Sequence, residues 1–264
     1  MRFAVIADIH GNAPALEAVI ADMQRFNVAR GVNLGDHFSG PIDPAKTADL
    51  LLSQEFASIL GNHDRWLIEQ DISDMGPSDR VAMDALTPPH LDWLRSLDAT
   101  KTVFDDVFLC HGTPTSDLTY WLERVDANGL VRSANREEIE READGIDASL
   151  ILCAHTHIPR SVHLSDGRMV LNPGSVGCPA YDDDLPVYHR VQSGTPNASY
   201  AIVEGTGKQR EITFRSIPYD THAAAQLALA NGRESWARAL ATGWLDTPGN
   251  WAACDRPDRH RGGY

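Results

Sequence analysis

The stretch "RFAVIADIHGN" (residues 2–12) couples an apolar run to a polar turn. The apolar run, residues 2–7, predicts a buried strand, and it ends directly before Asp8 and His10. Asn12 can then cap a helix, because the residues after it place apolar side chains at helical spacing. The stretch therefore predicts a strand that leads into a helix through a polar turn.

The same succession of elements follows further along the chain. A second strand is expected over residues 29–34, next to Asp36, and a third over residues 56–60, ending on "GNHD" (61–64). A helix over residues 43–54 joins these two strands. Alternating strands and helices predict a layered α/β sheet, in which ligands bind outside the carboxyl ends of the strands.

Hairpin patterns dominate the second half of the sequence. One hairpin is expected around Asp105, and its second arm stops at His111. A further strand, "ASLILCA" (148–154), runs straight into His155 and His157. Further strand patterns, among them "ASYAIVE" (198–204) and "REITFRSI" (210–217), and two helices follow, so we expect this half of the sheet structure to be antiparallel or mixed.

The 264 residues, 42% of them hydrophobic, are enough for a sizeable core. We find neither an internal repeat nor a linker, so we expect one domain over residues 1–264. Its core covers about residues 1–215, and two C-terminal helices and a tail follow in residues 216–264. The four cysteines show no C-x-x-C spacing, which indicates reduced, partly buried thiols.

The formal net charge of -14 bears on the kind of partner. It argues against a protein that coats nucleic acid through a basic surface, but a bound metal can still attract a small phosphorylated substrate. Neither a signal peptide nor a membrane span is recognisable near the first residues, so we expect a cytoplasmic protein without membrane partners. Whether the chain forms a homo-oligomer does not follow from its sequence.

Polar side chains gather at the ends of five expected strands, and each group alone has an ordinary explanation. A histidine pair two residues apart suits a metal but also occurs by chance in surface loops, and a single His111 would usually be a satisfied core histidine. Imidazole nitrogens and carboxylate oxygens are ligands for zinc, manganese and iron, and one carboxylate can bridge two ions. As an ordered set they predict a dinuclear metal centre, formed by Asp8, His10, Asp36, Asn62, His63, Asp64, His111, His155 and His157.

With these motifs in place, the sequence resembles the calcineurin-like metallophosphoesterase superfamily, and in detail its small bacterial and archaeal phosphodiesterase-like members. The resemblance covers about residues 1–215 through "ADIHGN", "NLGDHFSGP", "LGNHD", "CHG", "AHTHIP" and "NPGSVG". It implies an α/β fold, a four-layer α-β-β-α sandwich in which two mixed β-sheets pack face to face between flanking helices. The metal site would lie along one edge of the sheets.

The resemblance also implies a role for each residue. One ion would be held by Asp8, His10 and His157, the other by Asn62, His111 and His155, and Asp36 would bridge them. The two ions would clamp phosphate oxygens and acidify a bridging water, whose hydroxide attacks phosphorus. His63 would be the catalytic histidine, which stabilises the developing charge and protonates the leaving oxygen. The ions could be manganese, iron, zinc or nickel, since the ligand set suits each of them.

The second motif departs from the pattern of the superfamily's phosphatases. Those enzymes have GDxxDRG, whose aspartate orients the catalytic histidine and whose arginine grips phosphate, whereas this chain has Ser39 and Gly40 at those positions. Protein-phosphatase activity is therefore not expected. Either Asp64 or a backbone carbonyl could orient His63, and the sequence leaves this open.

The remaining polar residues are expected to lie outside the chemistry. His37 is interpreted as an uninvolved loop histidine, and "DDD" (182–184) as a solvated acidic loop. Asn172 and Ser175 of "NPGSVG" could orient metal ligands from behind. No role is expected for His90, His163, His189, His222 and His260.

The function that we expect is metal-dependent hydrolysis of a phosphodiester or a small phosphorylated metabolite or nucleotide. Two alternatives remain, a nuclease of the same superfamily and a non-catalytic scaffold like the retromer subunit that shares the fold. The complete ligand set and His63 favour an enzyme, and the acidic composition disfavours a nuclease.

Overall fold

The structure, a computed structural model, describes residues 1–245; the tail, with Cys254 and His260, lies outside the described residues. Its first sheet has five strands in the order β14-β13-β1-β2-β3. The strands are β1 (Arg2–Ile6), β2 (Gly31–Asn33), β3 (Phe56–Ser58), β13 (Ala198–Thr206) and β14 (Gln209–Ile217). The first three run parallel, and β13 and β14 are antiparallel additions.

The second sheet also has five strands, in the order β4-β5-β8-β10-β9. They are β4 (Lys101–Val103), β5 (Val107–Leu109), β8 (Leu150–Leu152), β9 (Arg160–His163) and β10 (Met169–Asn172). Its three central strands are parallel to one another, and its two outer strands are antiparallel. Both sheets are therefore mixed, each with a parallel centre.

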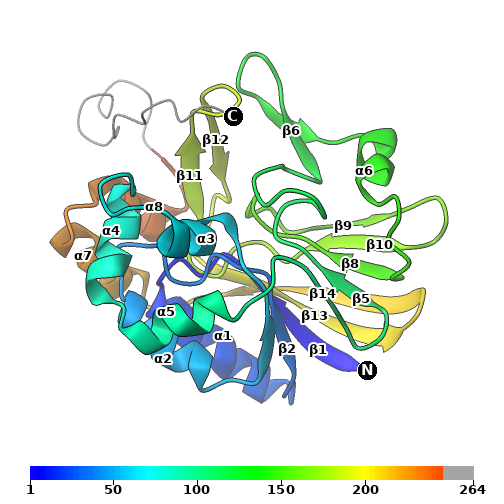
Figure 1. Cartoon of the computed structure of the whole chain (residues 1–264), viewed down its shortest axis with the longest axis horizontal. Helices are drawn as coiled ribbons and strands as arrows, with labels where there is room; N and C mark the ends of the chain where they lie inside the picture. The colour runs from blue at the N-terminus through cyan, green and yellow to red at the C-terminus, as the bar shows by residue number, and fades with distance from the viewer. Residues whose placement is uncertain (246–264) are drawn as a thin grey trace.

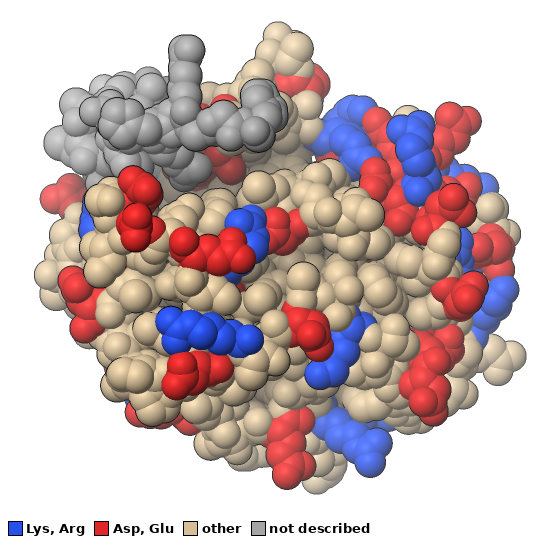
Figure 2. All heavy atoms as spheres, in the orientation of Figure 1, with Lys and Arg blue, Asp and Glu red and all other residues tan. Residues whose placement is uncertain are grey.

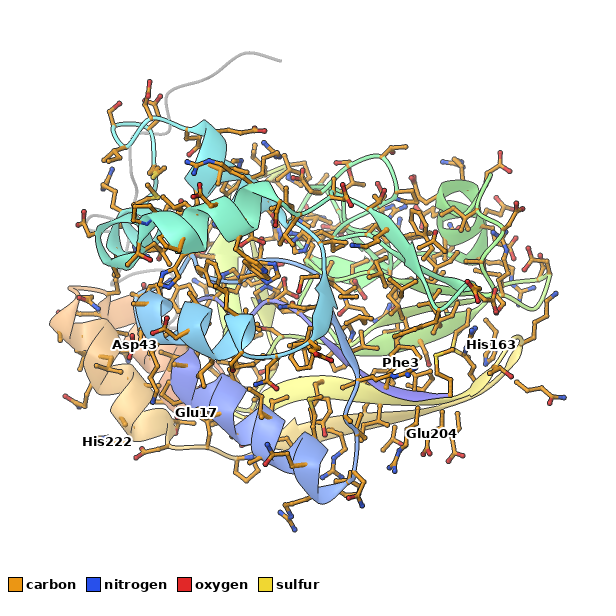
Figure 3. All side chains as sticks on the ribbon, turned by 60° about the horizontal axis from the view of Figure 1, so that its bottom comes forward. Phe3, Glu17, Asp43, His163, Glu204 and His222 are labelled. Atoms are coloured by element: carbon orange, nitrogen blue, oxygen red, sulfur yellow. The ribbon has the colours of Figure 1, made fainter. Side chains whose placement is uncertain are left out.

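The two sheets pack face to face because side chains alternate along each strand. On β1, Phe3 and Val5 enter the core between the sheets, together with Leu109 and Leu152 of the second sheet. Figure 3 shows Phe3 turned toward the second sheet and Glu204 of the neighbouring strand turned outward. The alternate residues of β1, such as Ile6, pack against helices instead.

Helices form the two outer layers (Figure 1). The first sheet is covered by α1 (Ala13–Arg25), α2 (Pro44–Leu52) and α5 (Pro88–Arg95). The outer face of the second sheet is covered by α6 (Arg136–Glu142), through Ile139 and Ala143. The predicted four-layer α/β sandwich is confirmed.

Local signals explain where these helices begin. Asn12 Oδ1 accepts the backbone N–H of Ala15 at 3.1 Å, and Asp43 accepts that of Lys46 at 3.2 Å. A proline stands in the first turn of each of these two helices, where its missing N–H costs nothing. Both starts agree with the sequence analysis to within a residue.

The remaining elements include helices that pack against the covering helices α1, α2 and α5. These elements are α3 (Asn62–Glu69), α4 (Pro77–Ala85), α7 (Thr221–Ala230), α8 (Glu234–Thr242) and the hairpins β6 (Glu123–Val125) with β7 (Val131–Ser133) and β11 (Ala180–Asp183) with β12 (His189–Gln192). Ile42 packs with α7 and α8 in one apolar cluster. We propose on this basis that the C-terminal helices belong to the same domain as the core.

The prediction that the acidic triplet "DDD" (182–184) forms a loop was wrong for its first two residues. Asp182 and Asp183 lie in β11 and pair with Arg190 and His189 of β12. The pairing depends on the partner strand, because the residues of the triplet have low strand propensity themselves. The three described cysteines, Cys110, Cys153 and Cys178, are free and fully buried, which is deeper than expected. Within residues 1–245 no helix is both long and apolar enough to cross a membrane.

Candidate metal centre

Strand ends from both sheets converge on one cluster of side chains. Asp8 and His10 follow β1, Asp36 follows β2, and His111 follows β5. His155 and His157 follow β8, and Asn62 and His63 begin α3. The carboxyl ends of parallel strands meet at one edge, and the structure brings these eight of the nine predicted side chains together there; the ninth, Asp64, bonds to the backbone of the loop.

The backbone at this edge has an unusual conformation. Eight non-glycine residues of the described chain have positive φ, and five of them belong to the cluster. These five are Asp8 (53°), His10 (51°), Asp36 (57°), His155 (68°) and His157 (58°). Left-handed backbone is uncommon outside glycine and persists where the surrounding structure enforces it, typically at functional sites.

His10 and His157 face each other across the first part of the cluster. The Nδ1–H of His10 donates to Ser39 O at 2.9 Å, and that of His157 donates to Cys178 O at 2.8 Å. These bonds direct both Nε2 atoms to the cluster, where they lie 3.3 Å apart. Two ring nitrogens at this distance repel unless a proton or a cation lies between them.

The carboxylate of Asp8 completes this group. Its Oδ1 lies 3.5 Å from His157 Nε2 and 4.0 Å from His111 Nε2. Burial lowers the pKa of His10 to about 4, whereas at His157 the attraction of Asp8 outweighs burial and raises the pKa. Asp8, His10 and His157 together thus favour one positive charge between the two imidazole rings. A metal ion that binds there would displace a proton from His157.

His111 and His155 form the second part of the cluster. The Nδ1–H of His111 donates to Leu34 O at 2.7 Å, so its Nε2 faces Asn62 Oδ1 at 3.1 Å. The Nε2–H of His155 donates to Leu118 O at 3.1 Å, which leaves its Nδ1 as the available nitrogen. Burial lowers the pKa of His155 to about 3, so this ring is neutral.

Asp36 lies between the two parts. Its Oδ2 is 3.8 Å from His10 Nε2 and 3.4 Å from His111 Nε2, and its Oδ1 accepts the backbone N–H of His63 at 2.9 Å. Burial opposes a charge on His111, but the Asp36 carboxylate outweighs it and raises the pKa of that ring to about 9. The close fit also explains Gly61, since a Cβ there would lie 2.2 Å from Asp36 Oδ1.

The surroundings of Asp8 show whether metal ions fit this cluster. It is fully buried, and neither of its carboxylate oxygens has a hydrogen-bond partner. A buried carboxylate without hydrogen bonds is costly unless a cation balances it. The surrounding donors are ring nitrogens, carboxylate oxygens and one amide oxygen, a set that suits transition-metal ions. The residues therefore fit bound metal ions.

His63 lies beside this cluster with 28% of its side chain exposed. One of its nitrogens is within 4.8 Å of ligand atoms of His10 and Asp36. Its Nδ1–H donates to Asp79 Oδ1 at 3.0 Å. Burial disfavours the charged ring, but the carboxylates of Asp79 and Asp36 outweigh it and raise the pKa of His63.

Both sequence-based hypotheses for the partner of His63 were wrong. Asp64 accepts the backbone N–H groups of Gly61, Asp36 and His37 at 2.7 to 2.9 Å, so it fixes the loop and not the ring. Asp79 was missed because it lies 16 residues further along the chain, in α4.

Gly40 stands where the superfamily's phosphatases have arginine. A Cβ at this position would lie 1.8 Å from the backbone oxygen of His10. No larger side chain fits there unless the loop moves.

The other histidines within residues 1–245 take no part in the cluster. Both ring nitrogens of His37 are used, by Asn33 at 2.9 Å and by Ile59 O at 3.0 Å. His163 and His222 are exposed and lie far apart at the periphery (Figure 3). The remaining two bond elsewhere: His90 lies 3.2 Å from Asp49, and the buried His189 contacts Tyr120 at 2.9 Å.

Two polar residues support the ligands from behind. Asn172 Nδ2 donates to Ala154 O at 2.9 Å, in the turn that carries His155 and His157. Ser175 Oγ donates to the backbone oxygen of Asp8 at 2.7 Å. Both residues thus hold backbone segments whose side chains enter the cluster.

Sequence reasoning also missed the aromatic side chains around the cluster. Tyr120 and Tyr181 share a hydrogen bond of 2.6 Å, and their rings contact His155 and His157 respectively. Cys178 Sγ lies within 4.8 Å of the ring nitrogens of His10 and His157. These residues gave no signal because isolated aromatic and cysteine residues are ordinary core components.

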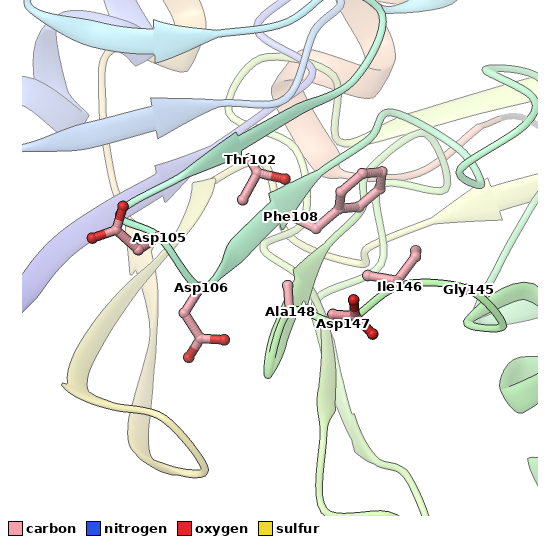
Figure 4. Close-up of a pocket in the computed structure, with 8 residues that line it drawn as sticks. All are labelled: Thr102, Asp105, Asp106, Phe108, Gly145, Ile146, Asp147 and Ala148. Atoms are coloured by element: carbon pink, nitrogen blue, oxygen red, sulfur yellow. The ribbon is translucent and has the colours of Figure 1, made fainter.

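A hollow between Asp106, Phe108 and Asp147 opens at the amino ends of β5 and β8 (Figure 4). The candidate metal-ligand cluster lies at the carboxyl ends of the same strands, and none of its residues lines the hollow. The Asp106 carboxylate is already bonded to Ser149 and to Arg210 at 3.1 Å. The hollow is therefore separate from the cluster.

Known proteins share this fold. Residues 1–159 match the family described as calcineurin-like phosphoesterase. The crystal structure of a metallophosphoesterase from Sphaerobacter thermophilus is similar with a TM-score of 0.69 at 26% identity, over 92% of this chain and all of that one. The hypothetical protein PH1004 from Pyrococcus horikoshii OT3 is similar in fold, with a TM-score of 0.67 at 16% identity, over 93% of this chain and 99% of that one.

A relative known from its sequence extends the match. The uncharacterized protein MJ0912 of Methanocaldococcus jannaschii is 24% identical over 258 residues, which cover 88% of this chain and 94% of that protein. The family match covers more than half of the chain and includes the three strand-end motifs of the first sheet. This chain belongs to the calcineurin-like phosphoesterase family and is a metal-dependent hydrolase of phosphoric esters.

Proposed function

We propose that this chain is a dinuclear phosphodiesterase that acts on a small phosphodiester, nucleotide or phosphorylated metabolite. One observation carries the proposal: a single carboxylate oxygen, Asp36 Oδ2, lies within 3.8 Å of a ring nitrogen from each half of the cluster. A carboxylate in that position can serve two ions at once. The unpaired oxygens of Asp8 add a second buried charge for the same ions.

The proposed assignment follows the two halves. Asp8, His10 and His157 would hold one ion, Asn62, His111 and His155 would hold the other, and Asp36 would be shared. Bound ions of this kind polarise the phosphoryl oxygens and lower the pKa of water that attacks phosphorus. The hydrogen bonds to backbone carbonyls keep the four imidazoles in the tautomers that metal binding requires.

His63 is the proposed catalytic residue. Because its Nδ1–H is bonded to Asp79, its Nε2 is the nitrogen that can reach substrate. The carboxylates of Asp79 and Asp36 raise the pKa of His63 and so favour the protonated ring, which can give a proton from Nε2 to the leaving oxygen. His63 holds this proton on Nε2 until negative charge develops on the leaving oxygen.

Surface charge supports a small substrate. Acidic and basic side chains are interspersed on the face in Figure 2, which has no continuous basic stretch. Together with the net charge of -14, this speaks against a groove that tracks a nucleic-acid backbone. Ser39 and Gly40 also remove two groups on which the superfamily's phosphatases rely.

The test compares bis(p-nitrophenyl) phosphate with p-nitrophenyl phosphate, on protein whose metal content has been measured. We expect faster turnover of the diester with manganese, and a loss of about 10³ in kcat in His63→Ala with both ions retained. Absence of turnover with manganese, iron, zinc and nickel, despite two bound ions, would leave a non-catalytic scaffold as the better interpretation. Cleavage of single-stranded DNA at moderate salt would instead favour a nuclease.

A further inference from the structure

We propose that Asp79 of α4 is the positioning residue of His63, in place of the missing aspartate of the second motif. This proposal rests on the catalytic role assigned to His63 above. Position 39 is serine here, so the second motif supplies no carboxylate at the position that orients the histidine in the superfamily's phosphatases. The carboxylate comes from a helix outside every motif that indicated the family.

The contacts of Asp79 are those of a fixed partner. Only 4% of the residue is exposed. Its Oδ1 accepts the Nδ1–H of His63 at 3.0 Å and also the hydroxyl of Ser39, and its Oδ2 accepts the N–H of Gly76 at 3.2 Å. Both oxygens are therefore engaged, and the carboxylate has little freedom to turn away from the imidazole.

Apolar packing holds α4 where this contact can form. Ala82, one turn beyond Asp79, lies in the same core cluster as Leu67 of α3 and Leu94 of α5. The helix begins at Pro77, directly after the Gly76 amide that Asp79 caps. The position of Asp79 is thus set by the core and not by the charge on His63.

Ser39 fits this arrangement better than an aspartate would. It is 1% exposed, and its Oγ lies 3.2 Å from His63 Nδ1 while donating to Asp79. An aspartate at position 39 would bring a second buried carboxylate against Asp79, and like charges at this range are costly. The serine instead adds a hydrogen bond, so the exchange at position 39 and the presence of Asp79 are complementary.

The contact fixes one tautomer of His63. With its proton on Nδ1 and directed to Asp79, the ring presents Nε2 to the cluster, next to the His10 ring at a centroid distance of 5.3 Å. A neutral imidazole without that acceptor would exchange between two tautomers and two ring orientations. Asp79 should therefore act on the proton transfer and not on substrate binding.

The first experiment measures kcat and KM for phosphodiesters whose leaving groups differ in pKa. In Asp79→Asn we expect kcat to fall by about 10² for poor leaving groups and by less for good ones, with little change in KM. The double variant Asp79→Asn with His63→Ala should be no slower than His63→Ala alone, because residues that act as one unit are not additive. Asp84→Asn, an exposed aspartate of the same helix, is the matched control. The proposal would be overturned if the losses in kcat were additive in the double variant, or if Asp79→Asn lowered kcat equally for every leaving group.

The second experiment does not depend on turnover. In zinc-loaded protein at alkaline pH, long-range ¹⁵N–¹H spectra report which nitrogen of His63 carries the proton. Ser39→Ala is the background, because the free hydroxyl could otherwise replace the carboxylate. We expect the proton on Nδ1 in Ser39→Ala, and a shift toward Nε2 when Asp79→Ala is added.

The two proposals fail in different ways. An unchanged tautomer in the double variant, folded by its melting curve, would overturn the role of Asp79 whatever the activity. If Asp79→Ala does not fold, Asp79→Asn in the same background keeps the shape of the side chain and gives the same reading. A tautomer that shifts while no phosphoester is hydrolysed would refute the proposed function and support the contact.

Discussion

Two aspartates, Asp8 and Asp22, are both buried and have opposite surroundings. Asp22 is 5% exposed and accepts three hydrogen bonds, from the Tyr200 hydroxyl at 2.8 Å and from two nitrogens of Arg215 at 2.9 Å. Asp8 is 0% exposed and accepts none. A paired buried carboxylate needs nothing further, whereas an unpaired one calls for a cation. Hydrogen-bond satisfaction thus separates a structural charge from a functional one.

The largest expected effect tests this contrast through activity. Asp8→Asn should lose metal from the site shared with His10 and His157, and turnover should fall by at least about 10³. Asp22→Asn, which makes the same chemical change, should keep both ions and turnover within about twofold. Metal analysis and steady-state kinetics on the two variants decide the matter. If Asp8→Asn stayed active and still bound two ions, the distinction between a functional Asp8 and a structural Asp22 would be refuted.

A second effect divides the cluster itself. His157→Ala should empty the site of Asp8 and His10, and His155→Ala should empty the site of Asn62 and His111, so each variant should bind one ion. His163→Ala, which changes an exposed histidine of β9, should bind two. Titration calorimetry and elemental analysis give the stoichiometry. Two tightly bound ions in both cluster variants would contradict the assignment of one histidine to each ion.

Sequence patterns predicted most of this cluster because its members follow buried strands. The apolar run before Asp8 and the run before His155 each mark a strand end, and parallel strands bring such ends together. The sequence could not show which buried aspartate lacks partners, since Arg215 lies 193 residues from Asp22.

Contacts that the tertiary structure creates were outside the reach of the sequence analysis. Asp79 reaches His63 only because α4 packs on α2 and α3, which no local pattern encodes. The left-handed backbone at His155 and His157 is likewise imposed by surrounding bonds, such as those from Asn172. The acidic strand at Asp182 exists because β12 lies beside it. Local propensity is weak in such places.

A third effect concerns stability. Added manganese should raise the melting temperature of the wild type and of Asp22→Asn, because an ion that binds only the folded state stabilises it. Asp8→Asn should respond much less, since one site is lost. Asp22→Asn should be less stable than the wild type by about 2 kcal/mol with or without the ion. A full manganese response in Asp8→Asn, measured by calorimetry at the same ion concentration, would show that Asp8 does not serve the metal.

The smallest expected effect is the pH dependence of the stability that the paired carboxylate of Asp22 provides. Burial raises the pKa of Asp22, but hydrogen bonds from Arg215 and Tyr200 outweigh it and hold the pKa below its usual value. The folded state therefore binds its proton at lower pH than the unfolded state, whose aspartate titrates near about 3.9. The stabilisation is complete above that value and is lost as pH falls through the folded-state pKa. The gap between wild type and Asp22→Asn in urea unfolding should thus be constant from pH 7 to about 5 and shrink below about 4. The control Asp92→Asn removes a carboxylate from an exposed pair with Arg95. Its unfolding free energy should not differ measurably from that of the wild type at any pH. A gap for Asp22→Asn that stays unchanged down to pH 3 would mean that the Asp22 charge contributes nothing, and that the packing of its neighbours stabilises this corner of the fold.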